Sequence, residues 1–170
     1  MKTNTSVNIS NMKVGTLLVI YVYMLVKIIL LKFNSLDLGF LWARLLAGLQ
    51  QPSLFSQRLH TGNLVPFQEI SRSMHSLTSH DIFNLFGNVA IFMPLGILLG
   101  LMFKREGMPG MRIFICAFFL SLGLEIAQLL FMIGQFDVDD ILLNSAGGFL
   151  GFVIYRLNTF IIWRGGESLH

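Results

Sequence analysis

The sequence predicts an all-α integral membrane protein with four transmembrane helices and an interfacial or re-entrant helix in the first outer loop. Of its 170 residues, 54% are hydrophobic and 12% are charged, and the mean hydropathy is +0.70. A soluble domain carries about 25% charged residues. Four apolar runs also approach the length of about 20 residues that a helix needs to cross the hydrocarbon core of a bilayer.

The four runs form one membrane domain, residues 14–163, between a cytoplasmic N-terminus at 1–13 and a tail at 164–170. The first run is longer than the apolar region of a signal peptide, and no small-residue cleavage site follows it, which favours a retained helix. Pro94 is expected to kink the second span. The predicted spans are Val14–Phe33, Phe83–Phe103, Ile113–Ile133 and Ile141–Trp163.

The loop between the first two spans is too long to lack secondary structure in a compact protein. Leu36–Gln50 reads as an apolar helix that is short for a span, so it lies in the interface or re-enters the membrane, and Pro52 ends it. Whether it crosses, re-enters or lies flat stays open. Gln68–Leu77 is a second amphipathic helix, and Ser79 or Asp81 is expected to cap the second span.

The distribution of basic residues predicts the orientation, because cytoplasmic loops of membrane proteins carry an excess of Lys and Arg. The short connector Gly134–Asp140 has three Asp and neither Lys nor Arg, which places it outside with the N-terminus in the cytoplasm. The long first loop opposes this assignment with Lys32, Arg44, Arg58 and Arg72. The cations then lying inside are Lys2, Lys13, Lys104, Arg105, Arg112 and Arg164.

Polar side chains recur within the apolar runs and fall at one depth. Residues three or four apart share a helix face, and in this orientation all the polar faces lie in the outer half of the membrane. A charged group at the centre of a membrane helix costs about 2.5–3.5 kcal/mol on insertion scales. We therefore expect these groups to meet around a polar cavity. They are Asn84 and Asn88, then Ser121, Glu125 and Gln128, then Asp137, Asp139, Asp140 and Asn144.

Structural roles compete with a functional one at each position. The three Asp precede a helix, where carboxylates favour the dipole and one of them can cap it. The two Asn on the second span suit hydrogen bonds between helices. Glu125 suits an ion pair with Arg58 or Arg72. The glycine pairs Gly96/Gly100 and Gly147/Gly151 suit close packing of helices, and such faces also allow a homo-oligomer.

Other classes of site have little support in the sequence. Asp137, Asp139 and Asp140 are weak candidates for Ca²⁺ or Mg²⁺, because they lack the spacing of a calcium loop. The histidines lack zinc spacing, and no cofactor is expected. The formal charge of +3, with aromatics confined to apolar runs, excludes nucleic acid as a partner. The single cysteine, Cys116, forms no internal disulfide.

Four ordered motifs give the chain a specific resemblance. They cover most of the sequence, from about Arg58 to Tyr155, and on them the chain resembles the VanZ-like family of small bacterial membrane proteins. The family often has an arginine just before the Asp cluster, where this chain has Gln135 and Phe136, so that role would fall to Arg58 or Arg72. The motifs are Asn63-Leu-Val-Pro66-Phe67, Asn84-x2-Gly87-Asn88-x3-Phe92-x-Pro94-Leu95-Gly96, Ser121-x3-Glu125-x2-Gln128 and Asp137-Val-Asp139-Asp140-x3-Asn144-x2-Gly147.

The resemblance implies a phenotype class rather than a reaction. Founding members of the family are associated with low-level resistance to teicoplanin-type glycopeptide antibiotics in Gram-positive bacteria. For this chain the resemblance implies a multi-pass protein of the bacterial cell membrane, with membrane lipids as its surroundings. The predicted outward-facing cavity is where such a protein would meet a cell-wall lipid precursor or a lipoglycopeptide.

Three functions therefore compete. In the first, the chain binds a polar lipid, and its phosphate is held by Arg58 and Arg72. The sugar or peptide of the lipid is bound by the amides of Asn84, Asn88, Gln128 and Asn144. Glu125 and the three Asp hold the basic groups in place or contact an amine. In the second, the chain is an intramembrane hydrolase or transferase of a lipid-linked substrate, with Glu125 as general acid or base. In the third, it is an assembly partner or a small transporter subunit.

Overall fold

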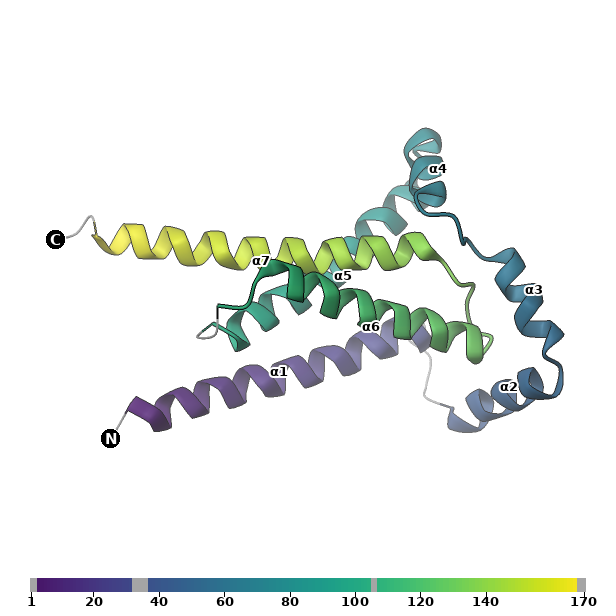
Figure 1. Cartoon of the computed structure of the whole chain (residues 1–170), viewed down its shortest axis with the longest axis horizontal. Coiled ribbons are helices and arrows are strands. Elements are labelled where there is room, and N and C mark those ends of the chain that lie inside the picture. The colour runs from purple at the N-terminus through teal and green to yellow at the C-terminus, as the bar shows by residue number, and fades with distance from the viewer. Residues whose placement is uncertain (1–2, 32–36, 105–106, 168–170) are drawn as a thin grey trace.

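The computed structural model describes residues 3–31, 37–104 and 107–167, with side chains for residues 11–30, 37–104 and 107–161. Within these residues the chain is helical and no β-strand occurs; one isolated parallel bridge joins Asn63 to Asp137. The prediction of an all-α fold is confirmed. The helices are α1 (Thr3–Leu31), α2 (Leu38–Gln50), α3 (Ser53–Thr61), α4 (Gln68–Ser76), α5 (Ser79–Met102), α6 (Gly110–Leu130) and α7 (Val138–Glu167) (Figure 1).

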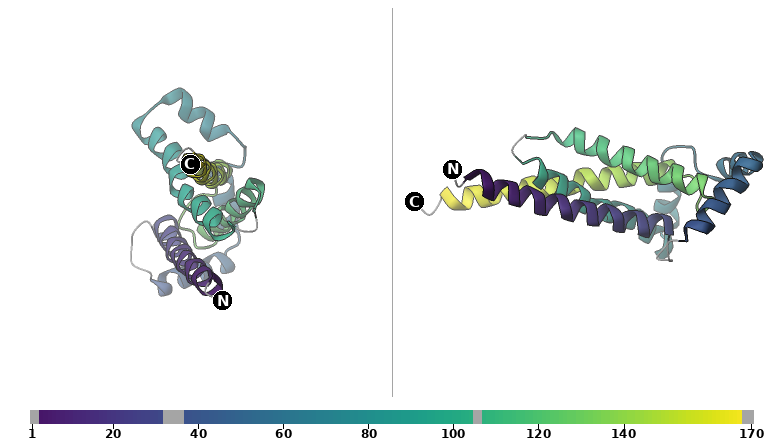
Figure 2. Two further views of the ribbon diagram at one scale, coloured as in Figure 1. Left: turned by 90° about the vertical axis from the view of Figure 1, so that its left-hand side faces the viewer. Right: turned by 90° about the horizontal axis from the view of Figure 1, so that it is seen from below.

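Four of these helices are long and apolar enough to cross a membrane, as predicted: α1, α5, α6 and α7. α5 has 24 residues. At about 1.5 Å per residue, the length of this helix exceeds the thickness of a hydrocarbon core, which is about 30 Å. α1 begins and α7 ends at one end of the bundle, beside the α5–α6 turn, which we call the terminal end (Figures 1 and 2). α2, α3, α4 and the α6–α7 connector occupy the opposite loop end.

The centre of the bundle is the pair α5 and α7, which make the most extensive helix contact. α6 packs on α7, and α1 packs on α5. The buried core includes Leu25 from α1, Phe92 and Leu95 from α5, and Ile113 and Leu124 from α6. Large apolar side chains on the outer faces of the spans remain exposed, among them Phe83 and Phe119. Such a surface suits lipid, because a soluble monomer rarely exposes large apolar patches.

α5 continues through Pro94 without interruption. Proline lacks the N–H that would bond to the preceding turn, and in membranes neighbouring side chains often satisfy the backbone groups that are freed. The Tyr21 hydroxyl of α1 donates to the Ile91 carbonyl, three residues before the proline. This bond ties α1 to α5 within one turn of the proline.

Most predicted span boundaries differ from the observed helix ends by a few residues, but α1 begins at Thr3, eleven residues before the predicted Val14. α5, α6 and α7 each begin three or four residues earlier than the apolar runs, because the first turn of a helix carries polar residues. The cap of α5 was predicted wrongly: Thr78, rather than Ser79 or Asp81, accepts a hydrogen bond from the backbone N–H of Asp81 at 3.2 Å. α7 continues to Glu167, into the segment that was predicted as a tail.

α6 ends at Leu130, three residues before the predicted Ile133. Met132 has a left-handed backbone (φ 53°). Its N–H bonds to the Leu129 carbonyl, and the Ile133 N–H bonds to the Gln128 carbonyl. This is a Schellman termination, and it turns the chain toward the Asp cluster.

The loop helices α2 and α4 match the predicted segments closely, whereas α3 was not predicted. α2 has 13 residues, about 20 Å of helix, so it is too short to cross the membrane. Some predicted positions lie outside the described residues. These are Lys2, Lys32, Phe33, Leu36, Arg105 and, for their side chains, Trp163 and Arg164.

Candidate functional site

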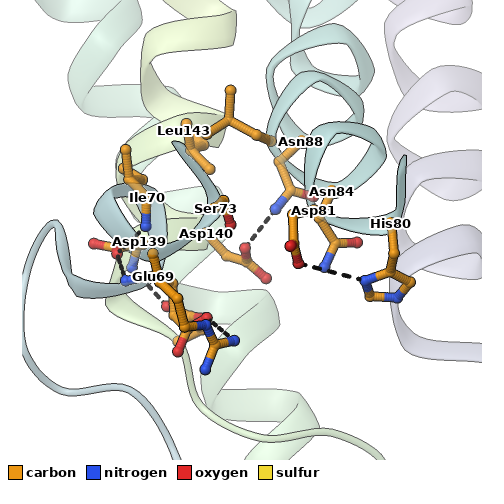
Figure 3. A pocket seen from close by; sticks show the side chains of 13 residues that line it. Glu69, Ile70, Ser73, His80, Asp81, Asn84, Asn88, Asp139, Asp140 and Leu143 are labelled. Atoms are coloured by element: carbon orange, nitrogen blue, oxygen red, sulfur yellow. Dashed lines mark hydrogen bonds and ion pairs between the residues drawn. The ribbon is translucent and has the colours of Figure 1, made fainter. Parts of the chain in front are cut away.

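A polar cavity opens at the loop end, between α4 and the first turns of α5 and α7 (Figure 3). Its volume is about 110 Å³, and it adjoins a larger cavity of about 640 Å³ beside the α6–α7 connector. The two cavities share several lining residues, so we treat them as one polar recess. The shared residues are Glu69, Arg72, Asn84, Asp137 and Asp140.

Asp139 fixes the α4 wall of this recess. Its side chain is almost completely buried and accepts three backbone hydrogen bonds from the start of α4. The donors are the N–H groups of Phe67 at 2.5 Å, Glu69 at 2.7 Å and Ile70 at 3.1 Å. The first N–H groups of a helix have no partner within the helix. Asp139 supplies that partner from α7, so it caps α4 and does not offer a free carboxylate.

Asp137 and Asn63 join the first loop to the α6–α7 connector. The Asn63 N–H bonds to the Phe136 carbonyl at 2.9 Å, and the Val138 N–H bonds to the Asn63 carbonyl at 3.0 Å. The Asn63 side-chain amide also donates to Asp137 Oδ1 at 2.9 Å. These contacts bring the first and the last of the four sequence motifs together, about 70 residues apart in the chain.

Asn84 and Asn88 form the α5 wall of the recess. The Asn88 amide donates to Asp140 Oδ1 across the recess (Figure 3). Asn84 lies one turn nearer the loop end, is exposed, and lines both cavities. Gln128 lines the larger cavity, although its amide nitrogen donates to the Ile29 carbonyl of α1 at 3.0 Å.

Glu125 and Asn144 lie behind the recess. Glu125 is buried, and its carboxylate accepts the Asp137 backbone N–H at 3.0 Å. The Asn144 amide donates to the Ser121 hydroxyl at 2.8 Å. Neither Glu125 nor Asn144 lines the two cavities. The structure therefore brings these residues to the same region, as the sequence suggested, but assigns them to its support.

The two candidate arginines are arranged differently. Arg72 lines both cavities and pairs with Glu69 one turn away on α4. The Arg58 guanidinium donates to the Gly134 carbonyl at 2.8 Å and does not line either cavity. Arg58 thus reaches the connector just before the Asp cluster. Neither arginine pairs with Glu125.

Carboxylates outnumber cations on the recess walls. Arg72 shares these walls with five carboxylates: Glu69, Asp81, Asp137, Asp139 and Asp140. In the part of the chain that the structure describes, no group of three or more His, Cys, Asp or Glu side chains is arranged to hold a metal ion. The carboxylates of the Asp cluster instead accept hydrogen bonds from the side chains of Asn63 and Asn88 and from backbone N–H groups.

Sequence reasoning missed several lining residues. Glu69 and Ser73 face the recess because they lie one turn apart on α4, the amphipathic helix that the sequence did predict. Asp81 and His80 open α5 and come within 3.9 Å of each other. The signal for all four was their position in or next to a short amphipathic helix directly before a span.

Four apolar helices with a polar recess at one end define a small multi-pass membrane protein whose polar side chains gather at one end of the helix bundle. The family described as VanZ/LLP1 matches residues 18–162, so the chain belongs to this family, as its motifs predicted. It is 35% identical over 107 residues to Protein VanZ of Enterococcus faecium, an alignment that covers 63% of this chain and 60% of that protein. No solved structure matches the chain.

Proposed function

We propose that the polar recess binds the head of a cell-wall lipid precursor, or of another polar lipid, and thereby lowers susceptibility to teicoplanin-type glycopeptides. One observation carries this proposal. The larger cavity of about 640 Å³ opens at the loop end and is lined by residues from five helices, α3 to α7, and from two of the loops between them. Ligand pockets typically measure about 300–1,000 Å³. Membership in the VanZ/LLP1 family supports the link to glycopeptides.

The lining favours some ligand groups over others. Asn84, Gln128 and Gln135 present amides, and Asp137 and Asp140 present carboxylates. Amides and carboxylates bind the hydroxyl, amide and ammonium groups of a sugar or peptide. Arg72, the cation on this wall, already pairs with Glu69. The recess is therefore suited to a sugar or peptide head more than to a bare phosphate.

The geometry favours binding over catalysis. A general acid or base must come within about 2.6–3.2 Å of the proton that it transfers. Glu125 lies behind the recess and bonds to the Asp137 N–H. The hydrolase or transferase that the sequence offered as an alternative would need Glu125 to reach the substrate.

The test replaces residues of the recess wall. Asn84→Leu and Asp140→Asn remove one amide and one carboxyl group from opposite walls, and Asp37→Asn serves as the control. Asp37 is exposed, also lies at the loop end, and caps α2 through Phe40, a role that Asn fills equally well. At matched membrane expression, we expect the two recess variants to lose resistance to teicoplanin and the control to keep it.

Binding is measured directly with the undecaprenyl-linked disaccharide pentapeptide and purified protein in nanodiscs. We expect the wild type and Asp37→Asn to bind this probe, and both recess variants to bind it at least about tenfold more weakly, which corresponds to one lost interaction of about 1.4 kcal/mol. Full resistance and full binding in both recess variants would refute the proposal.

A further inference from the structure

A second cavity lies at the terminal end, far along the bundle from the recess. Its volume is about 310 Å³. Lys104, just after α5, forms one side, and successive turns of α7 form the other. We call it the basic groove. Its lining residues are Lys104, Tyr155, Arg156, Thr159 and Phe160.

The helix contact below the groove explains why it exists. Gly100 of α5 faces Tyr155 of α7, and a Cβ at Gly100 would lie 2.5 Å from the Tyr155 ring. The ring therefore fills the space that a side chain on α5 would occupy. Tyr155 and Thr159 lie one turn apart and share a face of α7. This face and Lys104 enclose the groove where α5 ends and α7 continues.

The groove carries two cations and no carboxylate among its lining residues. Lys104 and Arg156 are both exposed, and within the described residues neither forms an ion pair. The Tyr155 side chain adds a hydroxyl group, whereas the Thr159 hydroxyl donates to the Tyr155 backbone carbonyl at 2.9 Å. Lysine and arginine beside the Tyr155 hydroxyl suit a phosphate, because charge-assisted hydrogen bonds to phosphate are strong.

The depth of the groove matches the headgroup region of a bilayer. Lys104 lies two residues beyond the end of α5 at Met102. In the sequence the apolar run of α7 continues to Trp163, seven residues beyond Arg156, so Arg156 is about 10.5 Å from that end at 1.5 Å per residue. An arginine at this depth can extend its guanidinium to the interface. Tyrosine is also enriched at this level of membrane proteins.

We propose that the basic groove binds the phosphate of an anionic phospholipid in the leaflet at the terminal end. Basic pockets between transmembrane helices commonly hold anionic headgroups. The exposed apolar side chains of α7 beside the groove, such as Leu157, would contact the acyl chains of the same lipid. This site is independent of the polar recess at the opposite end.

The experiment uses the purified full chain in detergent and measures thermal unfolding with three additions. These are phosphatidylglycerol, phosphatidylcholine and inorganic phosphate, at the same concentrations. We expect phosphatidylglycerol to raise the unfolding temperature more than phosphatidylcholine does, and native mass spectrometry to show retained phosphatidylglycerol. An equal effect of phosphatidylcholine would overturn the proposal, and so would an inorganic-phosphate effect that equals the lipid effect.

Variants assign the effect to the groove. Lys104→Gln and Arg156→Gln should each weaken binding of phosphatidylglycerol about 5-fold, and the double variant about 25-fold, since each cation near an anionic surface contributes about that factor. Arg156→Lys keeps the charge and should retain most of the binding. Arg112→Gln is the matched control, because Arg112 is exposed, lies at the same end on α6 and is outside the groove.

Two results separate this site from the recess. Asp140→Asn, in the recess, should leave the effect of phosphatidylglycerol unchanged. A double variant, Lys104→Gln with Arg156→Gln, that folds and keeps wild-type lipid binding would overturn the proposal. If the double variant does not fold, the two single variants and Arg156→Lys give the same comparison by mass spectrometry.

Discussion

A single carboxylate, Asp139, holds two parts of the chain together that lie about 70 residues apart. The residue before α4, Phe67, has a left-handed backbone (φ 68°) and its side chain cannot accept a hydrogen bond. The first N–H groups of α4 would therefore be unpaired without Asp139, which accepts three of them. A negative charge at this position also favours the helix dipole.

We expect Asp139→Ala to release α4 from α7. The substitution leaves backbone donors without partners, and each buried unsatisfied group costs about 1–3 kcal/mol. Hydrogen exchange should accelerate across residues 67–76, and the unfolding temperature in detergent should fall. Asp37→Ala removes a cap from α2 instead, so its faster exchange should be confined to residues 38–50. Unchanged exchange of α4 in Asp139→Ala would show that the cap does not hold the helix.

At the scale of helices, glycines set the distance between α5 and α7. A Cβ at Gly147 or Gly151 would overlap the backbone carbonyl of Val89 or Met93, and one at Gly96 would overlap the carbonyl of Gly148. Backbone atoms cannot move aside as side chains do. A residue larger than glycine therefore does not fit at these positions. This agrees with the packing role that the glycine spacing predicted.

Gly151→Ala should destabilise the bundle by about 1–3 kcal/mol, the usual cost of overpacking a tight interface. Gly123→Ala is the matched control, since Gly123 also lies within a span and a Cβ there meets no atom within 4 Å. The control should be neutral or slightly stabilising, because alanine favours helix over glycine. Reversible unfolding in mixed micelles measures both. Equal stability of the two variants would contradict the role given to the α5–α7 contact.

The helices differ in how well the sequence could predict them. The four spans follow from apolar length alone, which is why all four were found. The end of α6 was missed because Met132 takes the left-handed position that glycine usually takes in a Schellman turn. α3 was missed because its nine residues carry no clear apolar period.

The candidate site was predictable in part for a similar reason. Helical spacing placed Asn88 and Asp140 at one depth, and they bond to each other. The same spacing could not show that the carboxylates of Glu125 and Asp139 would accept hydrogen bonds from backbone N–H groups. Those donors belong to irregular segments, the connector and the start of α4, whose path depends on the whole fold.

At the scale of the whole molecule, the carboxylates whose side chains the structure describes all lie toward the loop end, whereas four of the eight described Lys and Arg side chains lie toward the terminal end. Four carboxylates line the recess in addition to Asp139, the buried cap of α4. The charged residues that line the basic groove are Lys104 and Arg156. Lys13 and Arg112 also lie toward the terminal end. At the loop end, Arg58 is bound to a carbonyl and Arg72 to Glu69.

This polarity predicts that the terminal end faces the cytoplasm, because lysine and arginine near short loops are retained on that side. Cysteine labelling tests it in a Cys116→Ser background. Gln57→Cys lies on α3 at the loop end, and Asn11→Cys lies on α1 at the terminal end; both native residues are exposed, and neither substitution removes a charge. In intact cells, a membrane-impermeant maleimide should label position 57 and reach position 11 only after permeabilisation. The reverse pattern would turn the recess toward the cytoplasm, where it would meet neither an extracellular glycopeptide nor the outer leaflet.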